Sequence, residues 1–406
     1  MATYRNMEES VSGTDLAHQR TRLRSHSIDL VNTSEFDAGH SPDSYYKARL
    51  SPQRYRLRQL LLPLVRAETA VLARIQAEMR SPFGDIYFPW TANLGSHTFY
   101  VLILPFPLWF GYLALARDLV FVLGLGIYFS GLVKDYLCLP RPESPPLHRI
   151  TMSKYTTQEY GCPSSHSANA AGLVLVISKH LWAEWTGSLV NYALVLVLVL
   201  YYTSLVSGRV YCGMHGFVDI SVGTIIGVFV VILRLVLGQV WDAAAYSGSL
   251  AFPLFILFAY YLSIAWHPVP LDACPCFDDS VAFVGVLVGL ELAHWSKALI
   301  TGDATIPYSF AELGIFRSIL RLGLGVLCVV VWKELVSKPV LTVLYRPIFR
   351  AFPKLDHSEA DKTQACGAMK SRFSLEILVR VSAYAGVSAI VVASYIVMDL
   401  CGCGVQ

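Results

Sequence analysis

Three short clusters of polar and charged side chains interrupt a chain that is otherwise rich in apolar residues. Ionisable residues at the edges of membrane segments are costly and usually functional. Each cluster lies at the end of an apolar run, and the members are Lys134 and Arg141 in "KDYLCLPRP", Ser164, Ser165 and His166 in "CPSSH", and Arg209, His215 and Asp219 in "SGRVYCGMHGFVD". The clusters are therefore candidates for one functional site.

The basic and hydroxyl groups suit the binding of a phosphate. Lys134, Arg141 and Arg209 provide three positive charges with many N–H donors, and a planar guanidinium can bind a phosphate through two hydrogen bonds. Ser164 and Ser165 lie where a helix is predicted to begin, and the backbone N–H groups of a helix N-terminus form an anion site. A single basic residue beside a span is usually a lipid-facing anchor. The combination of the three clusters is what favours a phosphate site.

The remaining groups could act on a bound phosphate. Two histidines, His166 and His215, permit one nucleophile and one general acid. Asp219 follows His215 by one helical turn, so its carboxylate can accept a hydrogen bond from the imidazole and fix its tautomer. An isolated histidine at a membrane edge is more often structural, so the interpretation depends on the whole set.

The composition indicates that membrane helices position these residues. Of the 406 residues, 54% are hydrophobic and 15% are charged, and the mean hydropathy is +0.50, whereas a soluble domain carries roughly 25% charged residues. The apolar runs are mostly about 18 residues or longer, which is long enough for a helix to cross a bilayer, and none alternates like a barrel strand. We predict an all-α polytopic membrane protein with about nine transmembrane helices. The small net charge of +3 gives no reason to expect a nucleic-acid partner.

The order of the predicted spans brings the three clusters together. The first and second clusters lie at the two ends of the longest polar interruption, residues 140–166. The second and third clusters are separated by two spans, so the chain returns to the same face of the membrane. All three clusters can therefore converge at one end of a helical bundle.

Four regions are predicted along the chain. They are a disordered polar N-terminus at 1–50, an interfacial segment at 51–96, a catalytic membrane core at 97–300, and additional C-terminal transmembrane helices with a basic connection at 301–406. In the second region, Arg54, Arg56 and Arg58 fit a helix that lies on the membrane with its arginines toward lipid headgroups. A helix that packs against protein fits equally well.

Other polar residues leave alternatives open. The nine cysteines show no zinc-binding pattern, since Cys274 and Cys276 lack a second pair of ligands. Asp272, Asp278 and Asp279 form an acidic loop on the catalytic side, which is either solvated or attracts a cationic group of a substrate. Glu291, His294 and Lys297 share one helical face, as an ion-pair network or a lipid path.

The three motifs, K-x6-RP, PSxH and R-x5-H-x3-D, resemble the signature of the type 2 phosphatidic acid phosphatase superfamily over roughly residues 130–230. The stretches "YGCPSSHSAN", "RVYCGMHGFVD" and "CPCFDDSVAF" resemble the branch of sphingosine-1-phosphate and fungal long-chain-base phosphate phosphatases. The chain departs from the usual pattern at Ser165, where the family has glycine, and at Gly208, where it has serine. Ser165 keeps its backbone N–H, whereas Gly208 loses a possible phosphate donor that Ser207 could replace.

The resemblance implies a role for each residue. His215 would attack phosphorus and form a phosphohistidine, Asp219 would hold His215, and His166 would protonate the leaving alkoxide and then activate water. The groups that bind the phosphoryl oxygens would be Lys134, Arg141, Arg209, Ser164 and Ser165. The implied substrate is a sphingoid long-chain-base 1-phosphate, whose ammonium Asp278 or Asp279 could attract, and no metal or cofactor is implied.

Two other functions share the same cationic site. One is a phosphatase for another lipid phosphate, such as phosphatidate or a polyprenyl diphosphate. The other is a lipid transporter or scramblase that only binds headgroups, which would need neither histidine nor Asp219. The expected partners are the lipid phosphate and the surrounding membrane lipids.

The sequence gives conflicting indications about the side of the membrane on which the catalytic face lies. Two spans before Lys134 put the N-terminus and the catalytic face on the same side, and the arginine-rich N-terminus favours the cytosol. The resemblance implies a multi-pass protein of the endoplasmic reticulum with a lumenal catalytic face, which we adopt as the expectation. The sequon Asn32-Thr33-Ser34 could report the side on which the N-terminus lies.

Overall fold

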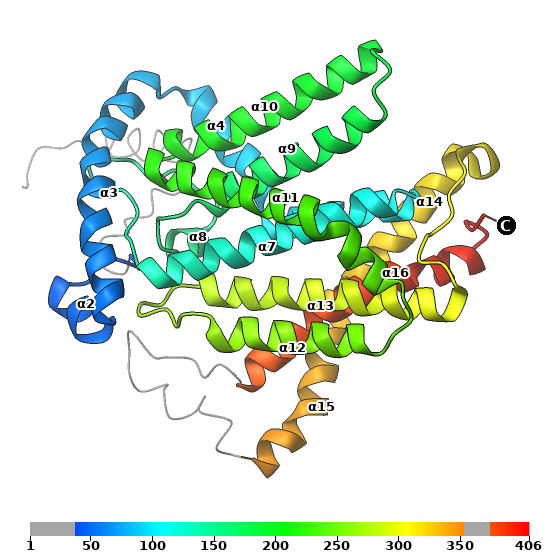
Figure 1. The fold of residues 1–406 in the computed structure, drawn as a ribbon. Helices are drawn as coiled ribbons and strands as arrows, with labels where there is room; N and C mark the ends of the chain where they lie inside the picture. Colours follow the sequence, from blue (N-terminus) through cyan, green and yellow to red (C-terminus); the bar gives the residue numbers. More distant parts are fainter. Residues whose placement is uncertain (1–36, 353–373, 406) are drawn as a thin grey trace, which may run out of the picture.

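The computed structural model describes residues 37–352 and 374–405, and all regular elements in these ranges are helical (Figure 1). The elements are α2 Asp43–Arg49, α3 Pro52–Met79, α4 Pro82–Ala92, η1 Asn93–Gly95, α5 His97–Ile103, α6 Pro105–Trp109, α7 Leu113–Leu137, α8 Lys154–Thr157, α9 Ser165–Ala183, α10 Leu189–Tyr211, α11 Phe217–Ala245, α12 Ala251–Trp266, α13 Cys276–Thr301, α14 Phe310–Val330, η2 Val331–Val336, α15 Ser337–Ala351 and α16 Leu375–Leu400. The long helices form a bundle, and α3 crosses the end at which α7 finishes (Figure 1). The predicted all-α class is thus confirmed.

The prediction of about nine spans is not confirmed. Within the described ranges, five helical segments are long and apolar enough to cross a membrane: α7, α10, α11, the continuous stretch Phe310–Ala351, and α16. The first expected span, residues 97–116, is broken into the short helices α5 and α6. Pro105 is the first residue of α6. A proline lacks the N–H that would continue a helical ladder. α12 is also apolar but has only 16 residues.

The expectation of a disordered N-terminus is wrong for residues 37–50, while residues 1–36 lie outside the described ranges. Residues Asp43–Arg49 form α2, and Tyr46 in this helix is fully buried. The hydroxyl of Tyr46 donates to Asp272 Oδ2 at 2.7 Å, and Gly39 N donates to the same oxygen at 2.8 Å. Asp272 therefore fastens the N-terminal segment to the loop before α13, rather than facing a substrate.

The arginines of α3 divide between protein and solvent. Arg54 donates to the carbonyl oxygens of Asp135 at 2.7 Å and Tyr136 at 3.0 Å, and buried Arg58 donates to Cys138 O at 3.2 Å. These carbonyls belong to the C-terminal end of α7, which lacks helical partners and carries partial negative charge. Of the three arginines named in the prediction, only Arg56 is exposed. The prediction that all three arginines face lipid headgroups is therefore wrong for Arg54 and Arg58, which hold the end of α7.

Close packing of α9 against α11 brings the second and third clusters together. A Cβ atom added at Gly223 would lie 2.3 Å from Ser164 O, and one added at Gly227 would lie 2.3 Å from Ala168 O. Glycines spaced four residues apart let two membrane helices approach to backbone contact. Ser164 N also donates to Asp219 O at 2.9 Å. The start of α9 is therefore held beside the first turn of α11.

A second charged cluster lies at the opposite end of α7. Arg117 pairs with Asp242 at 2.8 Å and with Glu291 at 2.9 Å, and Arg234 pairs with Asp118 at 2.7 Å and with Asp242 at 2.6 Å. These ion pairs join α7, α11 and α13. A buried charge is tolerated when it is paired, so the cluster fixes the mutual positions of the three helices.

The predicted helical face of Glu291, His294 and Lys297 does not act as one unit. Glu291 belongs to the ion-pair cluster, in agreement with the network alternative. Lys297 instead donates to the carbonyl oxygens of Asp303 at 2.9 Å and Thr305 at 2.7 Å, and so holds the loop after α13.

Candidate active site

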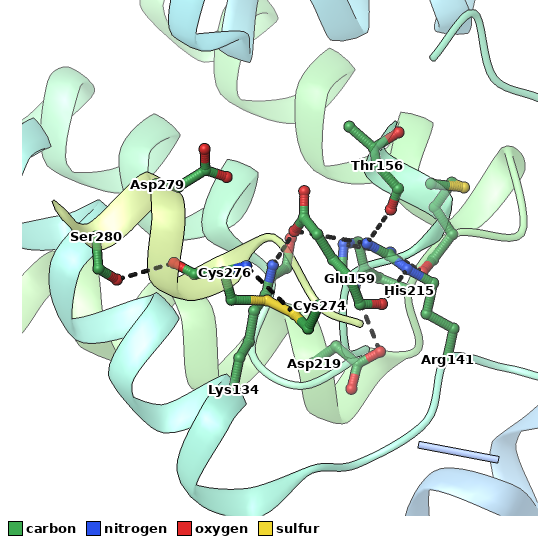
Figure 2. Close-up of polar contacts among 12 residues, drawn as sticks. Lys134, Arg141, Thr156, Glu159, His215, Asp219, Cys274, Cys276, Asp279 and Ser280 are labelled. Atoms are coloured by element: carbon green, nitrogen blue, oxygen red, sulfur yellow. Dashed lines mark hydrogen bonds and ion pairs between the residues drawn. A yellow bond between two sulfur atoms is a disulfide. The ribbon is translucent and has the colours of Figure 1, made fainter. Parts of the chain in front are cut away.

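The three sequence clusters meet at the end of the bundle where α7 finishes. Lys134 lies in the last turn of α7, Arg141 in the loop that follows, and His215 in the short connection between α10 and α11. Figure 2 shows the polar ends of these side chains gathered around the carboxylates of Glu159 and Asp219. The predicted convergence is present in the structure.

Two of the predicted phosphate-binding cations share one carboxylate. The side chain of Glu159 contacts Lys134 Nζ through Oε2, and the same oxygen lies 3.7 Å from Arg141 Nη2. Arg141 also donates to the carbonyl oxygens of Glu159 at 3.0 Å, Met214 at 2.7 Å and Thr156 at 2.7 Å. The guanidinium is thus fixed by backbone carbonyls, and Glu159 lies where two cations converge.

The imidazole of His215 is oriented from both sides. Arg141 Nη1 lies 3.0 Å from His215 Nε2, and because arginine can only donate, Nε2 must be the accepting nitrogen. The proton is then on Nδ1, which faces Asp219 Oδ2 at 3.5 Å, and that oxygen accepts from Gly216 N at 2.9 Å. The geometry selects the tautomer whose Nε2 lone pair points toward the cations.

The surroundings keep His215 neutral. The side chain is only 2% exposed. Burial lowers the pKa of His215 well below its ordinary value, and the charges of Arg141, Lys134 and Arg209 lower that pKa further. A neutral imidazole at physiological pH has the free lone pair that a nucleophile requires.

His166 and Arg209 face a cavity of about 720 Å³. Both line it, together with Glu159, Ser165 and Asn169. In the part of the chain that the structure describes, Arg209 Nε is buried without a hydrogen-bond partner. An unpartnered guanidinium N–H beside a cavity is a donor available to an anion.

The two serines of the second cluster differ in position. The hydroxyl of Ser164 is fully buried and caps α9, accepting from Ser167 N at 3.3 Å and from Ser167 Oγ at 3.0 Å. Ser165, by contrast, lines the cavity. Ser165 is therefore better positioned to touch an anion than Ser164.

Ser207 does not replace the serine that the family carries at position 208. The hydroxyl of Ser207 is exposed and donates to Thr203 O at 2.6 Å within its own helix. A Cβ atom at Gly208 would lie 3.0 Å from Phe88, on the side of α4. A serine at 208 would therefore meet an aromatic ring.

Asp278 and Asp279 belong to the first turn of α13, so the prediction that they lie in a loop is wrong, and both face basic groups of the chain. Asp279 lines the cavity and pairs with His97 Nδ1 at 3.3 Å, and Asp278 pairs with Arg380 at 3.3 Å. Nearby, a carboxylate oxygen of Asp135 and the sulfurs of Cys274 and Cys276 lie within 4.8 Å of one another. In the structure these two cysteines form a disulfide (Figure 2).

Sequence reasoning missed many residues that line this cavity, and four of these are titratable: Glu159, His97, Arg380 and Tyr384. Glu159 comes shortly before the second cluster, but a carboxylate is not expected among groups that bind phosphate. Arg380 and Tyr384 lie on α16, more than two hundred residues from Lys134 in sequence, and no local pattern connects them with the motifs.

Comparison with known proteins gives two consistent findings. Residues 115–242 match the family described as the PAP2 superfamily. The chain is 38% identical to a dihydrosphingosine 1-phosphate phosphatase of Saccharomyces cerevisiae, over 86% of this chain and 88% of the relative. It is 34% identical to a dihydrosphingosine 1-phosphate phosphatase of Schizosaccharomyces pombe, over 82% and 88% respectively.

A human relative is more distant. Sphingosine-1-phosphate phosphatase 2 is 28% identical over 64% of this chain and 66% of its own length. No solved structure matches the chain.

The different positions of the two serines predict different defects. Ser164→Ala removes the cap of α9 and should lower the free energy of unfolding by about 1 kcal/mol. Ser165→Ala should keep the melting temperature but weaken binding of orthovanadate, a phosphate analogue, by about tenfold, the effect of one hydrogen bond to a charged group. Thermal unfolding in detergent and vanadate inhibition measure the two effects. The reverse pattern would contradict this assignment.

Proposed function

Because this chain belongs to the PAP2 superfamily, we propose that it is a lipid phosphate phosphatase that hydrolyses long-chain sphingoid base 1-phosphates. The observation that carries the proposal is a neutral His215 whose Nε2 faces Arg141, while Glu159, which lies 3.7 Å from Arg141, lines a cavity of about 720 Å³ together with His166 and Arg209. The similarity to fungal dihydrosphingosine 1-phosphate phosphatases over most of both chains supports the substrate class.

The first step transfers the phosphoryl group to the enzyme. The incoming phosphate takes the N–H donors of Arg141, which frees His215 Nε2 to attack phosphorus in line with the ester oxygen. A P–N bond forms and the P–O bond to the lipid breaks, while His166 gives its proton to the leaving alkoxide. Burial and the charges of Arg209 and Lys134 lower the pKa of His166, so His166 takes up this proton only when the negative charge of the bound phosphate offsets these cations. Asp219 stabilises the positive charge that develops on the imidazole ring.

The second step releases phosphate. His166, now neutral, accepts a proton from a water molecule, which attacks phosphorus as the P–N bond breaks. Inorganic phosphate leaves, and both histidines return to their starting protonation states. The products are the free sphingoid base and phosphate.

Fixed cations stabilise the transition state in this mechanism. Lys134, Arg141 and Arg209 surround the phosphoryl oxygens and supply the positive charge that Mg²⁺ supplies in many phosphoryl-transfer enzymes. Ser165 and the backbone N–H groups at the start of α9 add donors, while Ser164 acts by capping that helix. Every group used in the two steps lies in the core proposed from sequence, residues 97–300.

The protein is proposed to reside in the endoplasmic reticulum membrane with the catalytic end facing the lumen. The motivation is the resemblance to long-chain-base phosphate phosphatases. The N-terminal helices α2 and α3 contact the catalytic end of the bundle, through Asp272 and the end of α7. The described N-terminal segment therefore lies on the catalytic side.

The function predicts phosphate release in the absence of divalent metal. Purified protein should release phosphate from dihydrosphingosine 1-phosphate in EDTA, because Lys134, Arg141 and Arg209 supply the positive charge that a metal ion would otherwise supply. His215→Ala should abolish both turnover and labelling of the protein by substrate phosphate. Activity that is lost in EDTA and restored by Mg²⁺ would overturn the mechanism.

The proposed roles of the two histidines predict different responses to the leaving group. His166→Ala lacks the general acid, so it should fail on alkyl phosphates but still form the phosphohistidine from p-nitrophenyl phosphate, whose leaving group needs no proton. His215→Ala should fail with both substrates. Burst kinetics with the two substrates measure this, and an equal loss in His166→Ala on both would contradict the assignment.

The orientation predicts the glycosylation state of the N-terminus. A lumenal catalytic face puts Asn32 in the lumen, where the sequon Asn32-Thr33-Ser34 is accessible to the glycosylation machinery. A mobility shift that is removed by endoglycosidase and absent in Asn32→Gln is expected. Labelling of an N-terminal tag from the cytosolic side of intact microsomes would contradict the proposed orientation.

A further inference from the structure

The carboxylate of Glu159 contacts two cations of the predicted phosphate site, Lys134 and Arg141. These two cations are called the cation cradle below. Glu159 Oε2 contacts Lys134 and lies 3.7 Å from Arg141, the side chain of Glu159 is 10% exposed, and it lines the cavity (Figure 2). Burial by itself would raise the pKa of Glu159, but Lys134 and Arg141 outweigh burial and hold the pKa below its ordinary value. The cradle is therefore neutralised in part by a carboxylate of the chain itself.

The ion pairs of Glu159 with Lys134 and Arg141 affect the binding of any phosphate that approaches His215. The phosphate must take the N–H donors of Lys134 and Arg141 that now face Glu159. A phosphate and a carboxylate repel each other, and a buried carboxylate that loses its cations is strongly destabilised. Productive binding therefore requires another cation for Glu159.

The basic side chains that line the other side of the cavity already face carboxylates. His97 pairs with Asp279 at 3.3 Å, and Arg380 pairs with Asp278 at 3.3 Å. Arg209 is assigned to the phosphate in the proposed mechanism. A ligand that brings its own positive charge next to its phosphate would meet the requirement without disturbing these pairs.

We propose that Glu159 binds the ammonium group of the substrate, in an exchange of ion pairs in which the phosphate takes Lys134 and Arg141 and the ammonium takes Glu159. The inference rests on the proposed function and deepens it. In a sphingoid base 1-phosphate the amine is on the carbon next to the phosphoester carbon, so it reaches the region beside the cradle when the phosphate binds. Asp278 and Asp279 keep their own partners in this exchange.

The exchange of ion pairs lets Glu159 determine which lipid phosphates the protein prefers. Phosphatidate and ceramide 1-phosphate carry the same phosphate monoester, but neither has a cation near it. Their binding would leave Glu159 buried beside a phosphate with no partner. The same carboxylate therefore favours substrates with a free amine and disfavours those without one.

The first test compares substrates on the unchanged protein. The values of kcat/KM are measured for dihydrosphingosine 1-phosphate and for its N-acetyl derivative, which has the same chain and phosphate but no charge on nitrogen. The free amine should be preferred by at least about tenfold. Equal values would overturn the ammonium site, while absence of phosphate release from both compounds would overturn the proposed function itself.

The second test assigns the preference to Glu159. Glu159→Gln keeps the shape but removes the charge, so kcat/KM should fall for the free amine and rise for the N-acetyl compound, which reduces the preference by about tenfold or more. Inhibition by orthovanadate, an anion without an ammonium, should become stronger. A misfolded variant would instead lose inhibition and turnover together.

A matched variant tests the alternative acidic group. Asp279→Asn removes a negative charge from the same cavity and should retain the preference for the free amine. Loss of the preference in Asp279→Asn but not in Glu159→Gln would overturn the proposal and assign the ammonium to the first turn of α13. Equal changes for both substrates in Glu159→Gln would also overturn it.

Discussion

The need to compensate buried positive charge governs the catalytic end of this protein. Lys134, Arg141 and Arg209 are all at least 95% buried, and in a medium of low polarity each requires an anion or several carbonyl oxygens. Glu159 and the backbone carbonyls around Arg141 meet this need for Lys134 and Arg141, whereas the buried Arg209 Nε has no hydrogen-bond partner among the described residues. The cradle is thus pre-formed, and binding of a phosphate becomes an exchange of partners.

The same requirement explains the far end of the bundle. About 17 residues of α7, or roughly 26 Å, separate Lys134 from Arg117, where a second set of ion pairs joins α7, α11 and α13. Between the two ends, glycine contacts of α11 with α9 allow the backbones to approach closely. Paired charges at both ends and tight packing between them give the site a rigid frame.

The C-terminal helix α16 takes part in the site although it lies outside the matched family segment, residues 115–242. Gly285 and Gly289 of α13 would each bring a Cβ within 2.4 Å of a carbonyl oxygen of α16. This close approach carries Arg380 and Tyr384 to the cavity wall. The segment that matches the family contains Lys134, Arg141, Arg209, His166 and His215, and α16 forms part of the cavity wall.

The sequence by itself determined the all-α membrane class and the residues of the three clusters. It could do so because the length of the apolar runs and the return of successive spans to one face can be counted along the chain. The 3.5 Å approach of His215 Nδ1 to Asp219 Oδ2, by contrast, is not one turn of a helix, because His215 lies before the start of α11. The capping role of Ser164, the protein contacts of Arg58, and the positions of Glu159 and Arg380 were decided by the tertiary structure alone. Each depends on which helices touch and how closely, and such contacts between distant segments leave no periodic signal in one sequence.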